Sequence, residues 1–305
     1  MTLSPPGSDC PVFCATGKRR MDQYLSNQPD YAWPASLSCQ FHQTSAGNTA
    51  LAEISHTGPL RVQKLFHDRD LAHCYVLHPP GGMVSGDDLD CRFCLHPRAK
   101  VLITTPASGK LYRSRQNGSM QTTRTVIEIG EEAMCAYLPQ DTIVFDGAYG
   151  DLETQVFLDS SATYFGWEHT VFGRSAGSLP FTVGRLSQRL SVYCDHRLLY
   201  RDHLRIDPET LASASGLDGM TSLASGLLVL RQGSQETDTV VVGCRQILED
   251  FPGKSGVTAV RDGLISIRLL SDRAEDTRNA LDSLWSLVGD QIMARTVETP
   301  RIWRT

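Results

Sequence analysis

Two pairs of closely spaced cysteines are the first residues whose types and spacing could bind a metal. Cys91 and Cys94 enclose an Arg-Phe pair, with His96 following, and Cys10 and Cys14 lie near the N-terminus. A structural zinc site needs about four thiolate or imidazole ligands around one ion. Cys91 and Cys94 lie in a strand-like stretch, where residues three apart point to opposite faces. A thiol site that combines all four cysteines is therefore kept as an alternative, and no tightly bound cofactor is expected.

The segment from His78 to Asp87, His-Pro-Pro-Gly-Gly-Met-Val-Ser-Gly-Asp, is the second place with constrained chemistry. Paired prolines fix φ and remove amide donors, and glycines permit positive φ, so the backbone must turn sharply. A phosphate-binding loop would need a Lys-Ser or Lys-Thr end and a following helix, and neither is present. The segment is predicted to be a rigid turn in which His78 and Asp87 could place an imidazole near a carboxylate.

Glu168 and His169, which follow Trp167, form a third candidate as a metal-contacting pair. Adjacent strand residues face opposite ways, so both would contact one ion only at a bend or bulge. The alternative is a hydrogen-bonded pair at the surface or rim. The sequence also contains no Gly-x-Ser-x-Gly elbow and no recognisable reactive-cysteine motif. An unrecognised hydrolase would thus lack a nucleophile and base, and the chain is not expected to be an enzyme.

Composition narrows the class of protein that positions these groups. The 305 residues are 41% hydrophobic and 21% charged, which is typical of a globular chain. A net charge of −5 with scattered Lys and Arg argues against a nucleic-acid partner. Apolar runs are strand-sized, far short of the roughly 20 residues that span a bilayer. Lys18, Arg19 and Arg20 do not precede an apolar core as in a signal peptide, so we expect a cytoplasmic chain with reduced cysteines.

The order of patterns along the chain predicts an extension followed by one β-rich domain. Residues 1–34 are rich in Pro and Gly without a sustained period, which indicates an irregular N-terminal extension. Residues 35–305 form the predicted domain. Within 35–206, short runs alternate apolar and polar residues between clusters of Gly, Pro, Asp and Ser, as in Thr123–Ile129. Such alternation is typical of half-buried strands and predicts a β body.

Residues 207–305 are predicted to add strands and one clear helix. Leu227–Leu230 and Leu264–Leu270 are strand-like apolar runs. A helix is predicted over about 273–294, with Ser271 or Asp272 as its N-cap. Its apolar stripe, spaced as one helix face, consists of Leu281, Leu284, Trp285, Val288 and Ile292.

Several phrases carry a family resemblance that spans about residue 37 to the C-terminus. In chain order they are Gly58–Lys64, Leu77–Asp87, Thr104–Ser114, Leu138–Ala148, Phe165–His169 and Phe172–Arg174, and the chain closes on Pro300–Trp303. They resemble the signature segments of the UreD family of urease accessory proteins, also called UreH, in the family's order. The extension before residue 34 has no counterpart in the family core. After Gly173-Arg174 the family usually carries Gly-Glu, where this chain has Ser178 and Leu179.

The resemblance implies both a fold and a role. The fold is mainly β, with strands stacked in a β-helix-like body and a small C-terminal α+β element. The role is that of a maturation scaffold that contacts apo-urease and binds an all-helical UreF-like partner. That partner recruits the UreG-like GTPase, and the assembly delivers nickel to the urease active site. Nickel would then be a cargo in transit through this chain.

A delivery path must bind an ion well enough to admit it and weakly enough to release it. Dispersed carboxylates and imidazoles meet that requirement, whereas a closed set of thiolates or imidazoles would hold a divalent ion too long. Within the family-like phrases, the path candidates are Asp87, Asp141, Asp146, Glu168 and, more weakly, His78. Each could instead be a turn or capping residue.

The C-terminal tail supplies the candidates for partner binding. Ile302 and Trp303 resemble an exposed aromatic anchor of the kind that interfaces use. The alternative is that Trp303 packs against its own domain.

Overall fold

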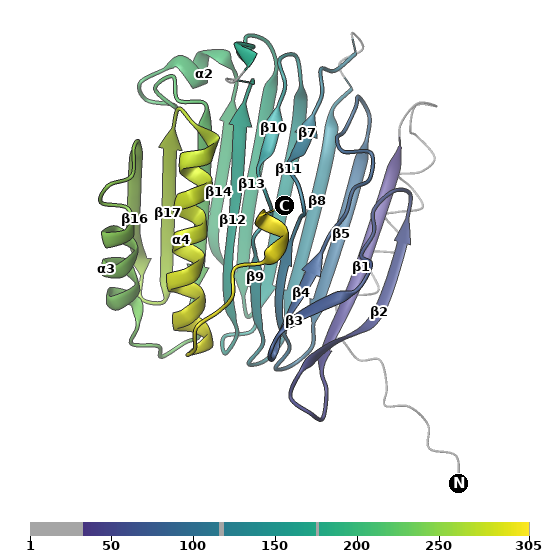
Figure 1. The fold of residues 1–305 in the computed structure, drawn as a ribbon, viewed down its shortest axis with the longest axis vertical. Coiled ribbons are helices and arrows are strands. Elements are labelled where there is room, and N and C mark those ends of the chain that lie inside the picture. Colours follow the sequence, from purple (N-terminus) through teal and green to yellow (C-terminus); the bar gives the residue numbers. More distant parts are fainter. Residues whose placement is uncertain (1–32, 116–118, 175–176, 305) are drawn as a thin grey trace. The chain divides into compact units, whose positions relative to one another are not determined.

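The computed structural model describes residues 33–304 apart from 116–118 and 175–176, and two β-sheets dominate these residues (Figure 1). The first sheet has seven strands in the order β14-β13-β11-β8-β5-β1-β2. Its inner pairings are parallel, whereas the edge strands β14 and β2 pair antiparallel. The strands are β1 (Pro34–Gln43), β2 (Thr49–Thr57), β5 (Asp88–Leu95), β8 (Gln121–Ile129), β11 (Tyr149–Leu158), β13 (Arg185–Cys194) and β14 (Arg197–Ile206).

The second sheet has ten strands. Eight follow the order β16-β17-β15-β12-β9-β6-β4-β3, and β10 pairs with both β12 and β7 beside this path. The predicted C-terminal strands β15 and β17 therefore extend the same sheet as the body. The strands are β3 (Leu65–Asp68), β4 (Leu71–Tyr75), β6 (Lys100–Thr104), β7 (Gly109–Leu111), β9 (Met134–Tyr137), β10 (Thr142–Val144), β12 (Thr163–Phe172), β15 (Ser222–Val229), β16 (Lys254–Arg261) and β17 (Leu264–Ser271).

The chain winds back and forth between the two sheets. From β5 in the first sheet it crosses to β6, returns as β8, crosses to β9, returns as β11, crosses to β12 and returns as β13. Successive turns pair in parallel, as β6 does with β9 and β9 with β12. The prediction of a mainly β fold with stacked strands and a small C-terminal α+β element is confirmed.

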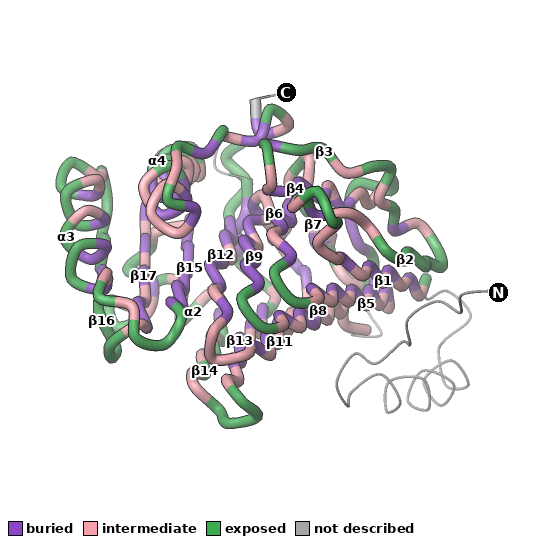
Figure 2. The backbone as a smooth tube through the Cα atoms, turned by 90° about the horizontal axis from the view of Figure 1, so that it is seen from below, coloured by how far each residue is buried: buried purple, intermediate pink, exposed green. Residues whose placement is uncertain are grey.

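The alternation in the sequence builds the core between the sheets. Along β1, Leu37, Cys39 and Phe41 are buried while their neighbours are only partly so, and β5 follows the same period. Figure 2 shows this alternation of buried and intermediate residues in the strands of the first sheet. Because side chains in a strand switch faces at every residue, the apolar set of each strand lies between the sheets.

A second core lies between the ten-stranded sheet and the helices. The helices are α2 (Pro208–Ala212), α3 (Thr237–Ile247), α4 (Ala274–Met293) and the short 3-10 helix η3 (Arg301–Arg304). Figure 1 shows α4 running alongside the strands of this sheet. Four residues of its predicted stripe are buried there and Ile292 is partly buried, and the Trp285 ring stacks on Phe165 with 6.5 Å between the ring centroids. Of the helices that the structure describes, none has the length and apolar character needed to span a lipid bilayer.

The observed start of α4 corrects one prediction. Arg273 occupies the N-cap position and its side chain makes no capping hydrogen bond. Ser271, the last residue of β17, is fully buried, and its hydroxyl donates to the Arg273 carbonyl at 2.7 Å and contacts Thr277 Oγ1 at 2.8 Å. The strand therefore turns Ser271 inward, away from the amides of the first turn, and the predicted Ser271 or Asp272 cap is wrong.

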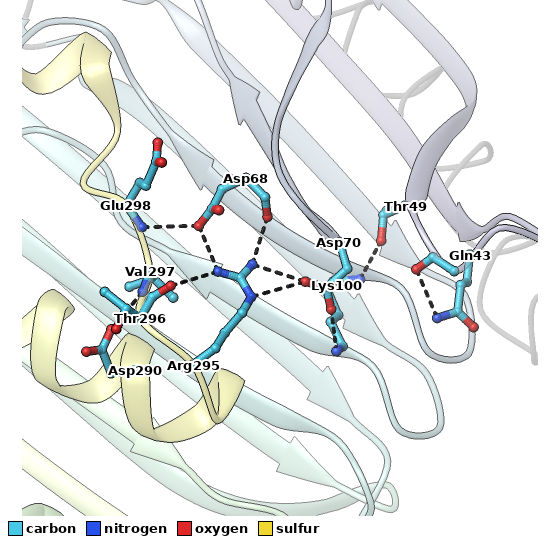
Figure 3. A network of polar contacts seen from close by, with 11 residues as sticks. Gln43, Thr49, Asp68, Asp70, Lys100, Asp290, Arg295, Thr296, Val297 and Glu298 are labelled. Carbon is cyan, nitrogen blue, oxygen red and sulfur yellow. Dashed lines mark hydrogen bonds and ion pairs between the residues drawn. The ribbon is translucent and has the colours of Figure 1, made fainter.

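A polar network fastens the segment after α4 to the hairpin of β3 and β4 (Figure 3). Arg295 donates to Asp68 Oδ2 at 3.0 Å and to Asp70 Oδ1 at 3.0 Å. Lys100 donates to the other Asp70 oxygen at 2.7 Å, and the Glu298 amide donates to Asp68 at 3.1 Å. Burial opposes the charge of Asp68, but the hydrogen bonds from Arg295 and Glu298 hold its pKa below the ordinary value. The C-terminal segment is thus fixed by charge.

Trp303 also belongs to this fixed segment. It is 9% exposed, lies 5.7 Å from the Trp167 ring, and donates its indole N–H to Thr104 Oγ1 at 2.8 Å. The expectation of an exposed aromatic anchor is therefore wrong for Trp303, because the ring completes the second core. The half-buried Ile302 packs against the same core, and its role in partner binding stays a prediction.

Replacing Trp303 by Phe should lower the free energy of unfolding by about 1–2 kcal/mol, because one buried hydrogen bond and some packing are lost. Urea unfolding followed by circular dichroism measures this loss. The matched control is Trp33→Phe, at a tryptophan that is 59% exposed, where we expect a change within about 0.5 kcal/mol. Equal losses in the two variants would mean that the Trp303 ring is not held against the sheet.

Candidate functional site

A cavity of about 270 Å³ lies between the two sheets and is the candidate functional site. Loop residues His78, Gly82 and Ser108 contribute to its wall, as do strand residues of both sheets. Most of the wall is apolar, with a small number of polar groups, which is the usual character of a binding cavity. The polar residues that line it from the strands include Thr123, Thr125, Thr154, Glu168, Thr170 and Gln188.

Two acidic residues of the described chain line this cavity, and Glu168 is the one whose carboxylate is not paired with an arginine, since Glu153 pairs with Arg124 and Arg189. Glu168 lies on β12, and both of its oxygens accept hydrogen bonds from the opposite sheet. Thr154 Oγ1 donates to Oε1 at 2.6 Å, and Gln188 Nε2 donates to Oε2 at 2.7 Å. Gln188 is itself held by Thr170, whose hydroxyl donates to Gln188 Oε1 at 2.9 Å. The carboxylate is therefore oriented by Thr154 of β11 and Gln188 of β13, and Thr170 on its own strand orients Gln188.

Burial changes the acidity of Glu168. Desolvation raises its pKa to about 7, although the hydrogen bonds from Thr154 and Gln188 favour the charged form. A carboxyl with this pKa exchanges its proton near neutral pH.

This shift predicts a pH dependence of stability. The folded chain holds the Glu168 proton up to about pH 7, whereas the unfolded chain releases it near the ordinary value of 4.5. Because the folded state binds more protons in this window, the Glu168 contribution to the free energy of unfolding falls as pH rises, by about 2 kcal/mol from pH 5 to pH 8. The substitution Glu168→Gln removes this pH-dependent contribution. We expect the difference in unfolding free energy between wild type and variant, from urea titrations, to change by that amount between the two pH values; a constant difference would contradict the buried, protonated carboxyl.

His78 and Asp87 lie in the sharp turn before β5, and only His78 lines the cavity. Asp87 is 6% exposed, and its Oδ2 accepts a hydrogen bond from the Val84 amide at 2.8 Å. This hydrogen bond closes the turn. Burial lowers the pKa of His78, and the nearby Asp87 charge acts against that change. The two groups therefore interact, as the sequence suggested. Asp87 has a clear local role in the turn.

Asp141 and Asp146 are placed outside the wall of the cavity. Asp141 is buried. Its carboxylate accepts a hydrogen bond from Ser108 Oγ at 2.9 Å and forms an ion pair with Arg278 of α4. Asp146 fastens a loop by accepting the amides of Thr182 at 2.7 Å and Val183 at 2.9 Å. Both carboxylates are thus held by local partners. Their place on a nickel path stays a prediction.

The residues around Glu168 separate into two faces of β12. His169 is among the residues that line the cavity, but its ring points to the opposite side of the sheet, where its Nε2 lies 2.9 Å from Ser222 Oγ in the layer beneath α4. Burial lowers the pKa of His169 to about 4, so it is neutral near pH 7. Glu168 and His169 therefore do not contact one ion, as the strand period predicted.

The cysteine candidates are also separated. Cys91 faces the cavity, and burial raises the pKa of its thiol to about 12. Cys94 lies on the other face of β5 and is only half-buried. The two sulfurs therefore cannot coordinate one ion. Cys10 and Cys14, the other two cysteines of the predicted thiol site, lie outside the described residues. Among the described residues, which are 33–304 without 116–118 and 175–176, no group of three or more His, Cys, Asp or Glu side chains is placed to hold a metal.

Sequence reasoning missed the groups that orient Glu168. Thr154, Gln188 and Thr170 come from β11, β13 and β12 and meet only because the strands stack in register. A polar residue at an inward position of an otherwise apolar run was the available signal. Gln188, between the buried Leu186 and Leu190, is the clearest case.

Comparison with known proteins gives a consistent family. The model of the family described as UreD urease accessory protein matches residues 34–304. A urease accessory protein UreD from Psychromonas ingrahamii is 32% identical over 300 residues, which covers 92% of this chain and 97% of the relative. UreD proteins from Enterobacter sp. strain 638 and Azoarcus sp. strain BH72 are each 35% identical over 90% of this chain and cover 96% and 94% of their own lengths. The chain belongs to the UreD family of urease accessory proteins.

Proposed function

We propose that this chain is a non-catalytic scaffold that conducts nickel through its interior to apo-urease. Family membership supports a role in urease maturation. The observation that carries the finer proposal is the buried Glu168 carboxylate, oriented by Thr154 and Gln188 in a cavity between the sheets. A fully buried carboxyl whose direct hydrogen-bond partners are neutral side chains is costly for a fold and suits a cation that comes and goes.

The chemistry of the cavity suits transit. Glu168 offers hard oxygen ligands, the threonine hydroxyls offer further weak ones, and water can complete the coordination of a divalent ion. An arriving Ni²⁺ would displace the Glu168 proton, and departure would return it. Binding of this kind is weak enough to be reversed, which a delivery path requires.

The partners follow from the family. We infer that the chain contacts apo-urease, binds a UreF-like helical protein, and meets a UreG-like GTPase through that protein. The sequence has no phosphate-binding loop, which agrees with nucleotide chemistry in the GTPase. We place this assembly in the cytoplasm.

Co-expression tests the proposal. Apo-urease and the UreF-like and UreG-like proteins of the same source are produced with and without this chain, and urease activity and nickel content are measured. We expect both to depend on the chain, while the purified chain hydrolyses no urea. Equal activity and nickel in its absence would overturn the proposal.

A further inference from the structure

A row of polar side chains continues from the cavity toward the side of the sandwich. On the ten-stranded sheet, Glu168, Ser225 and Arg268 occupy paired positions of β12, β15 and β17. On the seven-stranded sheet, Thr154 and Asp202 lie in one row with Leu190 between them. The two rows face each other. Hydrogen bonds join them at both ends, from Thr154 to Glu168 and from Arg268 to Asp202.

The far end of the row meets solvent. The Asp202 side chain is 19% exposed and that of Arg268 is 37% exposed, so water reaches the ion pair that bridges β14 and β17. Between this pair and the cavity lies Ser225, which is 8% exposed and whose Oγ has no hydrogen-bond partner within the described chain. A buried hydroxyl without a partner is unfavourable in an ordinary core. It is suitable as a ligand or a water site along a path.

Charged groups stand at both ends of the row. Glu168 lies at the cavity end, and at the other end the Arg268 guanidinium donates to the Asp202 carboxylate. Two carboxylates that share one interior attract a cation, and Arg268 is the cation that now lies at this end. A divalent ion that binds Asp202 must therefore displace Arg268.

We propose that Asp202 is a second cation station between Glu168 and an opening at β14 and β17, and that Arg268 closes this opening by occupying the carboxylate. The inference rests on the proposed conduction of nickel. It goes further by naming an end of the path and the side chain that controls it. Arg268 is in this scheme a positioning residue that competes with the ion.

Nickel binding to the full-length chain in its co-expressed complex tests the station. Equilibrium dialysis with Ni²⁺ alone gives the dissociation constant for wild type, Arg268→Gln, Asp202→Asn and Glu168→Gln. Removing the competing cation should lower the dissociation constant about fivefold or more in Arg268→Gln, and Asp202→Asn should raise it by a similar factor. Arg268→Lys, which keeps the charge, should behave as wild type. Arg273→Gln, which breaks an exposed ion pair with Glu275, is the matched control and should change nothing.

The outcomes separate the two proposals. If Glu168→Gln weakens nickel binding and delivery while Arg268→Gln and Asp202→Asn leave both unchanged, the row ends at Glu168 and the ion pair is a structural brace. If Glu168→Gln also leaves both unchanged, the interior path itself is wrong. Should Arg268→Gln fail to fold, as judged by its melting temperature, Asp202→Asn still tests the station, because an unchanged dissociation constant in that variant would overturn it.

Discussion

Replacing Glu168 by Ala should lower the nickel content of co-expressed urease about tenfold, the scale on which metal affinity falls when a ligating site is disrupted. The reason is that the Glu168 carboxylate is held across the cavity by Thr154 and Gln188, whereas the carboxylate of Glu153, the other acidic residue of the described lining, is paired with arginines. The fold should survive, because the change removes a buried carboxyl whose charged form burial disfavours. Metal analysis of the purified urease, together with its activity, measures the effect.

Two variants make this result specific. Glu168→Gln keeps a side chain that can hydrogen-bond Thr154 but loses the charge, and should fail in nickel delivery as Ala does. Asp151→Ala is the matched control on β11, because Asp151 does not line the cavity and its side chain pairs with Arg189. We expect normal nickel content in that variant. Normal nickel in both Glu168 variants would remove this residue from the path.

The strands were predictable because half-buried strands leave a period in the sequence. The alternation over Thr123–Ile129 corresponds to β8, and the predicted helix over about 273–294 is α4 (Ala274–Met293). Apolar Leu60, Val62 and Phe66 also alternate with polar residues, but β3 begins only at Leu65 and Arg61 makes an isolated bridge to Leu77. Arg61 bonds the carbonyls of Gly58 and Leu60, and this local structure overrides the pattern.

The candidate site was less predictable, because its geometry depends on which strands become neighbours. The family-like phrases pointed to Glu168, but nothing local to that phrase identifies Thr154 or Gln188 as its partners. The same phrases gave equal weight to Asp146, which fastens a loop. A carboxylate that caps a turn and one that lines a cavity have the same appearance in a sequence, and only the stacking of the strands separates them.

Replacing Arg295 by Met should lower the free energy of unfolding by about 3 kcal/mol, the usual scale for removing one partner of a buried ion pair. Arg295 is 15% exposed and Asp68 is 7% exposed, so the change leaves the Asp68 carboxylate buried without its counter-ion. Asp70 keeps Lys100. Urea unfolding near pH 7 measures the loss, and Met preserves much of the apolar stem of the side chain.

The pH dependence and a matched control identify the cause. Hydrogen bonds hold the pKa of Asp68 below its ordinary 3.8 against the effect of burial, so its stabilisation is present above that value and is lost as pH falls through the folded-state pKa. The difference between wild type and Arg295→Met should therefore narrow in acid. Arg273→Met breaks an exposed pair and should cost less than about 0.5 kcal/mol. A loss for Arg295→Met that is equally small would mean that the segment after α4 is held by the packing of Val297 and Trp303, with the charges of Figure 3 contributing little.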